Sequence, residues 1–482
     1  MMKKLVIFVV LILTAGCDDS SEDKKQNPLS WLAVNIPSSG PAFENISGNL
    51  VCNGDPLAPP HLEITAEDTC AGALSDGQSS SATYTFKSGE ENTSCQVSVK
   101  CTDGEFEIIH SQEVIFTSEL DIADYDFSGW EEFDRPIEDY ITACASELGH
   151  MAFRKSISEM TVFDGRLYIG WGDADLNLGR IFPVEIRSYT SLDPSSLQTE
   201  AVTQEEEISS YRLTGGTIVV PGVDATEDNL IGNTYILDNG QWVKNRSLEW
   251  AWHVHDTLFF DGSFMSVGSG GSLDDYNNST VRSFVWSSTD GIEDNTVVFD
   301  NPHPQPPGDN RFTHLLGAGS KMYVFGYVSA SNTTYSQYFE YDGTSFDAVT
   351  TPPNFFIFNS WPTSEDSGLV SGVKIATPLV FGVMKWTPDG FLTVDAFNGL
   401  TVYDMFAMDD SRVLVMYIEG DTYPDESERP WNFKVGLYDT DGNLTEIFNR
   451  MTEVKPVSIA WYEKNILIGL EDGSIQVITK SW

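Results

Sequence analysis

The chain has 482 residues, of which 41% are hydrophobic, so it is long enough for two or three domains with sizeable cores. Its 72 acidic residues against 27 basic ones give a formal net charge of −45. This charge argues against binding to nucleic acid, and against docking on an anionic membrane through a basic face. The excess of acid fits solubility or salty surroundings, and alternatively a divalent cation or a cationic partner.

The first residues have the pattern of an export signal. Lys3 and Lys4 precede an apolar run at residues 5–13, which is too short for a bilayer span of about 20 residues. The next residues, ending Leu-Thr-Ala-Gly-Cys, resemble the lipobox of bacterial lipoproteins. The resemblance implies cleavage after residue 16, lipid attachment at Cys17 and a place in the bacterial cell envelope. The two aspartates after Cys17 are similar to an inner-membrane retention signal, and the choice of membrane stays open.

Residues 17–29 are polar and lack apolar periodicity, which predicts a flexible tether. Residues 30–120 alternate short apolar and polar runs, which predicts a small immunoglobulin-like β-sandwich. This domain is interpreted as a spacer, or alternatively as a binding module. Because an exported protein forms disulfides, two are expected there, in one of three pairings. The cysteines concerned are Cys52, Cys70, Cys95 and Cys101, and Cys144 is left over, either free or bridged to one of them.

A pair of apolar runs recurs from residue 121 to the C-terminus. Residues 160–172 read MTVFDGRLYIGWG, in which Asp164-Gly165 has the sequence of a two-residue hairpin turn. A second hairpin pattern alternates with the first, as in YILDNGQW from Tyr235. Two hairpins make a four-stranded antiparallel unit, and seven such units predict a seven-bladed β-propeller over residues 121–482. The central turns are placed near residues 165, 216, 262, 320, 372, 410 and 465.

The last of these units, residues 456–482, has three apolar runs instead of four. Residues 121–155 contain Trp130-Glu131-Glu132-Phe133, a run that belongs to no repeat. We therefore expect this early segment to supply the missing outer strand and to close the ring, because closure pairs strand edges that would otherwise be exposed.

Polar residues align at the start of the innermost strands when the units are superposed on their turns. Residues of the innermost strands line the channel of a propeller, so the aligned side chains are expected to meet at one mouth. This mouth is the candidate ligand-binding or catalytic site, although a channel filled with water would also be polar. The residues assigned to it are Glu159, Asp256, His314, Asp404 and Ser458, with Arg212, His253 and His255 close by; His255, Asp256, His314 and Asp404 are the acid/base candidates.

Two short patterns could hold a cation. His253 and His255 project from the same face of a strand, beside a carboxylate, and could bind a metal or act as acid and base. Asp173, Asp175 and Asn177 present oxygen atoms at alternate positions, as a Ca²⁺ loop does, and an Asx-rich turn explains the same spacing. Ca²⁺ is the one cofactor that the sequence indicates.

Trp286 followed by Ser288-Thr289-Asp290-Gly291 resembles part of an Asp-box, the turn motif of sialidase-like propellers. The resemblance implies a sialidase-like or kelch-like propeller fold. It stops at the fold, because the arginine triad and the Tyr-Glu pair of a sialidase site have no match in this sequence. Signatures of nucleophile elbows, phosphate loops, dinucleotide sites and zinc proteases are absent from the sequence as well.

Three functions are compatible with these features. The first is binding of a glycan, peptide or envelope protein at the channel mouth, with exposed aromatics such as Trp171, Trp252 and Tyr403 contributing. The second is a hydrolase or lyase acting on an extracellular polysaccharide. The third is a passive scaffold, since a propeller fold by itself does not define an activity.

Overall fold

The chain divides into two compact units, residues 1–124 and residues 125–482. The structure, a computed structural model, describes the backbone of the strands in the first unit and most of the second. In the second unit the described residues are 126–148, 154–227, 230–293, 295–303, 308–330, 333–349, 355–364, 367–374, 380–409, 412–420, 430–439 and 441–481.

The strands of the first unit form two four-stranded sheets. Cys17 and the predicted tether lie outside the described residues, as do the side chains of Cys52, Cys70, Cys95 and Cys101. One sheet has the order β1 (Leu29–Asn35), β3 (Asn45–Gly54), β6 (Ser81–Lys87), β5 (Ala73–Leu74), and the other β2 (Ser39–Pro41), β8 (Glu107–Thr117), β7 (Ser94–Thr102), β4 (Glu63–Asp68).

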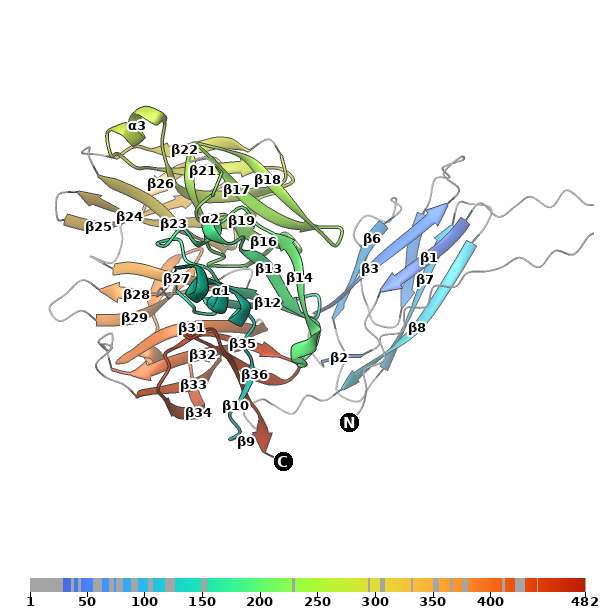
Figure 1. The fold of residues 1–482 in the computed structure, drawn as a ribbon. Helices are drawn as coiled ribbons and strands as arrows, with labels where there is room; N and C mark the ends of the chain where they lie inside the picture. Colours follow the sequence, from blue (N-terminus) through green and yellow to red (C-terminus); the bar gives the residue numbers. More distant parts are fainter. Residues whose placement is uncertain are drawn as a thin grey trace, which may run out of the picture. The chain divides into compact units, whose positions relative to one another are not determined.

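The second unit is a seven-bladed β-propeller, and Figure 1 shows its sheets following one another around a ring from green to red. Each blade is a four-stranded antiparallel sheet, as predicted. The strands of each blade are given from the innermost to the outermost. Blades one to three are β11 (Glu159–Phe163), β12 (Arg166–Gly170), β13 (Glu185–Tyr189), β14 (Leu197–Val202); β15 (Arg212–Thr214), β16 (Thr217–Pro221), β17 (Ile231–Asp238), β18 (Gln241–Glu249); and β19 (Ala251–Phe260), β20 (Ser263–Gly270), β21 (Arg282–Ser288), β22 (Thr296–Asn301). Blades four to seven are β23 (Asp309–Ala318), β24 (Lys321–Ala330), β25 (Thr333–Tyr341), β26 (Phe346–Ala348); β27 (Phe355–Ser364), β28 (Ser367–Lys374), β29 (Val380–Thr387), β30 (Gly390–Thr393); β31 (Leu400–Asp409), β32 (Arg412–Glu419), β33 (Trp431–Asp439), β34 (Leu444–Thr452); and β35 (Pro456–Tyr462), β36 (Asn465–Leu470), β37 (Ile475–Ile478), β10 (Glu131–Asp134).

The inner hairpins have the turns that their sequences predict. Asp164 and Gly165 both have positive φ, 47° and 70°, as a two-residue turn that matches strand twist requires. One prediction is wrong: Gly372 lies inside β28, paired with Ile357, and the hairpin of that blade turns between Ser364 and Ser367. The misplacement arises because the blade lacks an Asp-Gly pair at its turn, so the glycine within the strand gave the stronger signal.

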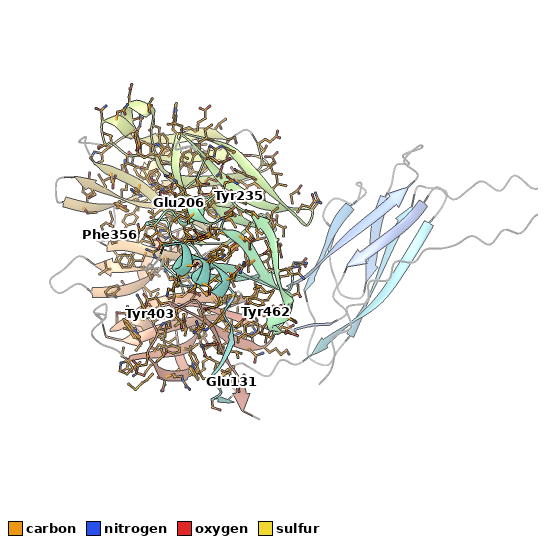
Figure 2. The ribbon with its side chains drawn as sticks, viewed as in Figure 1. Glu131, Glu206, Tyr235, Phe356, Tyr403 and Tyr462 are labelled. Atoms are coloured by element: carbon orange, nitrogen blue, oxygen red, sulfur yellow. The ribbon has the colours of Figure 1, made fainter. Side chains whose placement is uncertain are left out.

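The ring closes as the sequence predicts, because β10 pairs antiparallel with β37 as the outer strand of the last blade. Glu131, labelled in Figure 2, lies opposite Val477. A second pairing continues this contact: Phe127 of β9 (Asp126–Phe127), which precedes β10, pairs with Lys480 of β38 (Lys480–Ser481), which follows β37. The last blade therefore contains strands from both ends of the propeller sequence, and this pairing closes the ring.

The hydrophobic core lies in layers between adjacent blades. One layer joins the third and fourth blades through Val267, Val285, Phe312 and Val324, all fully buried. Another layer joins the fifth and sixth blades through residues of β28, β29, β31 and β32. Because each sheet buries both faces against its neighbours, the strands read as near-continuous apolar runs, and the polar positions fall at the channel and the rim.

The sequence pattern does not indicate α1 (Glu138–Leu148), which follows β10 and packs on the first blade. Its Tyr140 lies 4.2 Å, centroid to centroid, from Trp171. Cys144 is free and buried in this layer, which settles its predicted alternatives. The other helices are short: α2 (Leu178–Ile181), α3 (Leu273–Asn277) and the 3₁₀ turns η2 (Pro194–Ser196) and η3 (Asp395–Phe397). Within the described residues, no helix has both the length and the apolar character needed to cross a membrane.

Candidate functional site

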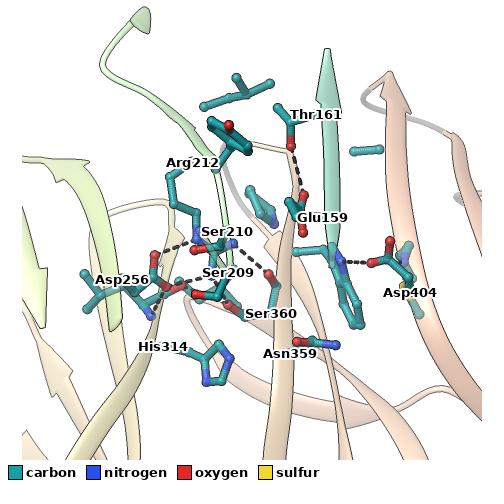
Figure 3. Close-up of a pocket in the computed structure, with 18 of the residues that line it drawn as sticks. Glu159, Thr161, Ser209, Ser210, Arg212, Asp256, His314, Asn359, Ser360 and Asp404 are labelled. Carbon is teal, nitrogen blue, oxygen red and sulfur yellow. Dashed lines mark hydrogen bonds and ion pairs between the residues drawn. The ribbon is translucent and has the colours of Figure 1, made fainter. Parts of the chain in front are cut away.

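A cavity of about 570 Å³ lies on the axis of the propeller, and residues of all seven innermost strands line it. Figure 3 shows Arg212, Asp256, His314, Ser360, Glu159 and Asp404 around it. Sequence positions as far apart as Ser158 and Val457 therefore meet in one space. Of the predicted site residues, the lining includes Glu159, Arg212, His255, Asp256, His314 and Asp404.

The aligned residues lie at equivalent points of the strand ladder. In five innermost strands the pairing register shifts immediately before the aligned residue, so each of these residues sits at a β-bulge, and four of the five line the cavity. Two of the predicted residues behave differently: Ser458 is fully buried outside the cavity lining, and His253 lies next to the lining. The bulge residues are Asp256, His314, Asn359, Asp404 and Ser458.

Asn359 is the functional position that the sequence reasoning misses. It lines the cavity from β27 and has the same place in the ladder as Asp256, since Ile357 pairs with Gly372 as Val254 pairs with Gly268. A second bulge between Pro362 and Ser364 adds one residue between Asn359 and its turn. β31 also holds a second bulge, between Ala407 and Asp409, so the extra residue alone does not explain the miss. The sequence places the turn of the fifth blade near residue 372, inside β28, and a count from there does not reach Asn359; the alignment of Gly372 with Gly268 finds it.

Asp256 joins three blades and carries the strongest ion pair of the site. Its Oδ1 and Oδ2 accept hydrogen bonds from Arg212 Nε at 2.5 Å and Nη2 at 2.7 Å. The same carboxylate accepts the N–H of Thr257 and the N–H of Leu315 on the next blade, each at 2.7 Å. Burial raises the pKa of Asp256, and Arg212 with the two N–H groups opposes that rise. All of its acceptor capacity is directed to the protein, so Asp256 acts as a structural anion.

Arg212 reaches across the channel. It comes from the second blade and also donates to Ser360 of the fifth, to the carbonyl oxygen at 3.0 Å and to Oγ at 3.2 Å. Ser360 Oγ in turn donates to the carbonyl of Leu315 at 3.2 Å. The guanidinium is thus fixed by partners on both sides of the cavity.

Asp404 occupies the position of Asp256 in the sixth blade and makes the same inter-blade bond. It accepts the N–H of Met405 at 2.8 Å and the N–H of Ile459 on the next blade at 2.8 Å. Its third donor is Trp361 Nε1 at 3.3 Å, from the preceding blade. Among the described residues, no Lys or Arg forms an ion pair with Asp404. Burial therefore dominates and raises the pKa of Asp404 to about 7, although these donors lower it.

Glu159 lies between Arg212 and Asp404 in Figure 3 and is the least committed carboxyl group of the site. Among the described residues, its one hydrogen-bond donor is Thr161 Oγ1, at 2.9 Å. Burial and the nearby Asp404 raise the pKa of Glu159 to about 8, and Thr161 and Arg212 oppose the rise. A carboxyl group that keeps its proton near neutral pH can both donate and accept a hydrogen bond.

The three histidines of the site lie on adjacent blades. The rings of His253 and His255 stack, with centroids 5.7 Å apart and planes at 19°. Burial lowers the pKa of all three, and that of His314 falls to about 3. His314 Nδ1 lies 2.9 Å from Thr313 Oγ1. His255 Nε2 lies 3.4 Å from Ser269 Oγ. The lowered pKa values favour the neutral form of all three imidazoles.

The predicted Ca²⁺ residues form a turn in the structure. Asp173 accepts the N–H groups of Arg154 and Leu176, and Asn177 adopts a left-handed conformation (φ 56°) at the start of α2. The side chain of Asp175 is 87% exposed and points to Arg154 at 3.6 Å. In the part of the chain that the structure describes, no three His, Cys, Asp or Glu side chains gather as metal ligands.

The Asp-box-like segment forms a turn outside the cavity. Asp290 Oδ1 accepts the N–H of Ile292 at 2.9 Å and of Glu293 at 3.0 Å, and Ser288 Oγ accepts the N–H of Gly291 at 3.1 Å. The motif therefore stabilises the β21–β22 hairpin. Trp171 is a correction: it is fully buried and donates Nε1 to the carbonyl of Glu185, so it offers no exposed surface to a ligand.

No protein-family model matches the chain, and no curated protein matches it. Several solved structures are similar. A Bacteroides thetaiotaomicron protein of unknown function has 11% identity and a TM-score of 0.34, with 96% of this chain and 100% of that one covered. The Trypanosoma rangeli sialidase bound to the inhibitor DANA has 9% identity and a TM-score of 0.31, over 61% of this chain and 57% of the sialidase. An exotype rhamnogalacturonan lyase has 11% identity and a TM-score of 0.30, over 92% and 89%.

Proposed function

We propose that this chain is a lipid-anchored protein of the bacterial cell envelope whose propeller binds a glycan in the axial cavity. The observation that carries the proposal is one cavity of about 570 Å³ lined by all seven innermost strands. Its volume falls within the range of roughly 300–1,000 Å³ that is usual for small-molecule sites. The anchor at Cys17, the tether and the spacer domain with two disulfides are parts of the same proposal, and they rest on the sequence.

The chemistry of the lining favours a ligand with many hydroxyl groups. Glu159 has acceptor capacity that no described residue uses, and Ser210 Oγ is buried without a hydrogen-bond partner. Asn359 offers both a donor and an acceptor. Trp361 and Met405 supply apolar surface between these polar groups. Sugar rings present hydroxyl groups at their edges and C–H groups on their faces, so they match a wall of this mixed kind.

Binding can be tested by isothermal titration calorimetry with a panel of neutral and acidic oligosaccharides. Glu159→Gln and Asn359→Ala each remove hydrogen-bonding capacity, and each is expected to weaken binding roughly tenfold. Glu249→Gln, at the exposed end of β18, is the matched control and should bind as the wild type does. Wild-type affinity in both cavity variants would refute a ligand site in this cavity.

A hydrolase or lyase is the second candidate, and one observation favours it. Glu159, with its pKa raised to about 8, keeps a proton near neutral pH, as a general acid must. Asp256 accepts four hydrogen bonds and Asp404 accepts three, so Glu159, with one, is the carboxyl group that would act as the acid of such an enzyme. Release of reducing ends or unsaturated products from the panel, lost in Glu159→Gln, would establish an enzyme. If no glycan binds or reacts, the passive scaffold is supported.

The envelope anchor has its own test. Cys17→Ala is expected to move the protein from the membrane fraction to the soluble fraction, because the lipid would no longer be attached. The alternative, an anchor elsewhere in the chain, predicts an unchanged membrane fraction. Accessibility to added protease in intact cells then decides whether the propeller is surface-exposed.

A further inference from the structure

Basic side chains gather at one side of the cavity mouth, on β19 and β23. Three of the seven histidines in the chain, His253, His255 and His314, lie there with Arg311. His255 and His314 line the cavity itself. In a chain of net charge −45, a group of four basic side chains is a specific local feature, and the carboxylates within ion-pair distance of it are Asp309 beside Arg311 and Asp224 beside His253.

The hydrogen bonds leave this group with unused donors. Arg311 Nε is buried without a hydrogen-bond partner, although its side chain as a whole is 25% exposed. The acidic groups nearest to it are too distant for hydrogen bonds: Asp309 Oδ2 lies 3.6 Å from Arg311 Nη2, and Asp224 Oδ2 lies 3.9 Å from His253 Nδ1. His253 Nδ1 is held by the carbonyl of Val223 at 2.8 Å, which leaves Nε2 available.

The charge of Arg311 acts on both imidazoles of β19. Arg311 lowers the pKa of both His253 and His255, in addition to the larger effect of burial. The charged and titratable groups that act on these imidazoles are Asp224 from the segment after β16 and, from β23, Asp309, Arg311 and His314. Asp256 follows His255 on β19, Arg212 of β15 lowers the pKa of His314, and Tyr327 of β24 is influenced by Arg311 and Asp309. Asp256 is already neutralised by Arg212. A buried donor without an acceptor destabilises a structure, and a ligand can supply the acceptor.

We propose that His253, His255 and Arg311 form a subsite for an anionic group, and that the glycan ligand is therefore an acidic sugar with a carboxylate. The inference rests on the proposed function and narrows its ligand class. A guanidinium presents donors in a planar fork that matches two carboxylate oxygens, and Nε belongs to that fork. Because His255 is shared with the cavity, the sugar ring would lie in the cavity while its carboxylate meets Arg311.

This arrangement predicts that His253 and His255 become protonated when the anion binds. An anion beside His253 and His255 favours their charged forms, so binding raises their pKa and takes up a proton. Affinity for the acidic ligand is therefore highest at low pH and declines as the pH rises through the pKa that the histidines have in the complex. A neutral sugar in the same cavity has no such dependence on these residues.

The experiment uses the intact protein and two minimal probes, sodium galacturonate and sodium sulfate, at constant ionic strength. The Cε1–H resonances of His253 and His255, assigned with His253→Gln and His255→Gln, report on binding by NMR. We expect both resonances to shift with added galacturonate, and the midpoint of their pH titration to move to higher pH. Shifts with sulfate as well would show that any anion is accepted, and shifts with galacturonate alone would show selectivity for the sugar acid.

Arg311→Gln is expected to weaken galacturonate binding roughly tenfold, since one charge-assisted pair is lost. Arg282→Gln is the matched control, because Arg282 is 30% exposed and pairs with Asp300 on the outer part of the third blade. The melting temperature of each variant shows whether it is folded. Histidine resonances that respond to neither anion would overturn the subsite, and so would an unchanged affinity in Arg311→Gln. If neutral glycans still bind and lose affinity in Glu159→Gln, the proposed function survives that failure.

Discussion

Asp256 and Asp404 have the same place in blades three and six, but only one of them faces a cation. Each sits at a bulge of its innermost strand and accepts the backbone N–H of the residue after the bulge in the next blade, Leu315 or Ile459. Arg212 forms two hydrogen bonds with Asp256, whereas Asp404 faces Glu159 and Trp361. The bulge therefore determines the hydrogen bond that each carboxyl group accepts from the next blade. The residue across the channel determines whether that carboxyl group is compensated by a positive charge. One half of the cavity wall is a compensated ion pair, and the other half is a pair of carboxyl groups that share a tendency to stay protonated.

The largest effect is expected from Asp256→Ala. It removes the anion and leaves Arg212 partly buried, with Ser360 as its remaining partner, and breaking a buried pair in this way costs about 3–5 kcal/mol. The free energy of unfolding from urea titration measures the loss. Asp300→Ala is the control, since it breaks the exposed pair with Arg282 and should cost roughly 1 kcal/mol or less. Equal costs for the two variants would show that the buried pair contributes no more than the exposed one.

Asp404→Asn should have an intermediate effect, about 1–3 kcal/mol, because the amide nitrogen would meet an N–H donor where the carboxylate accepted one. The size of the effect depends on pH. The pKa of Asp404 is raised to about 7 in the folded protein, so the wild type loses stability as the pH rises from the ordinary range to about 7. The variant lacks this loss, and its deficit should shrink on going from about pH 5 to about pH 8. A deficit that grows with pH would mean that Asp404 is ionised and stabilising.

Ser458→Ala tests the equivalent position in the last blade. Ser458 Oγ donates to the carbonyl of Ile157 at 2.6 Å across the seam between the last and first blades. Alanine would leave that buried carbonyl without this donor, at a cost of about 1 kcal/mol. Thermal unfolding measures it, and Ser279→Ala, at an exposed turn, is the control. A neutral result would assign the closure of the ring to the pairings of β10 with β37 and of β9 with β38.

The sequence predicts the repeating part of this molecule well and the individual charges poorly. Asp-Gly turns and apolar runs fix the blades. A constant count back from the turn brings Glu159 and Asp256 to one cavity, and the alignment of Gly326 with Gly268 brings His314 there, because each blade repeats the same geometry. Asn359 escapes that count because the turn predicted for its blade, near residue 372, falls inside β28. Nothing in the spacing of Arg212 indicates that it would reach the fifth blade, since its partners depend on side-chain length and on the width of the channel.

The smallest effect, and the one that separates the two halves of the cavity most directly, is expected from Glu159→Gln. Burial and Asp404 raise the pKa of Glu159 to about 8, so the folded state holds this proton more tightly than the unfolded state does. Wild-type stability therefore declines as the pH rises from the ordinary glutamate range towards 8, and glutamine abolishes that decline. The melting temperature of the variant relative to the wild type should rise between about pH 5 and about pH 9. Glu249→Gln should show no such change. If the difference between Glu159→Gln and the wild type is constant with pH, then Glu159 is ionised throughout. Its negative charge would then have to be balanced by a cation, as Arg212 balances the charge of Asp256.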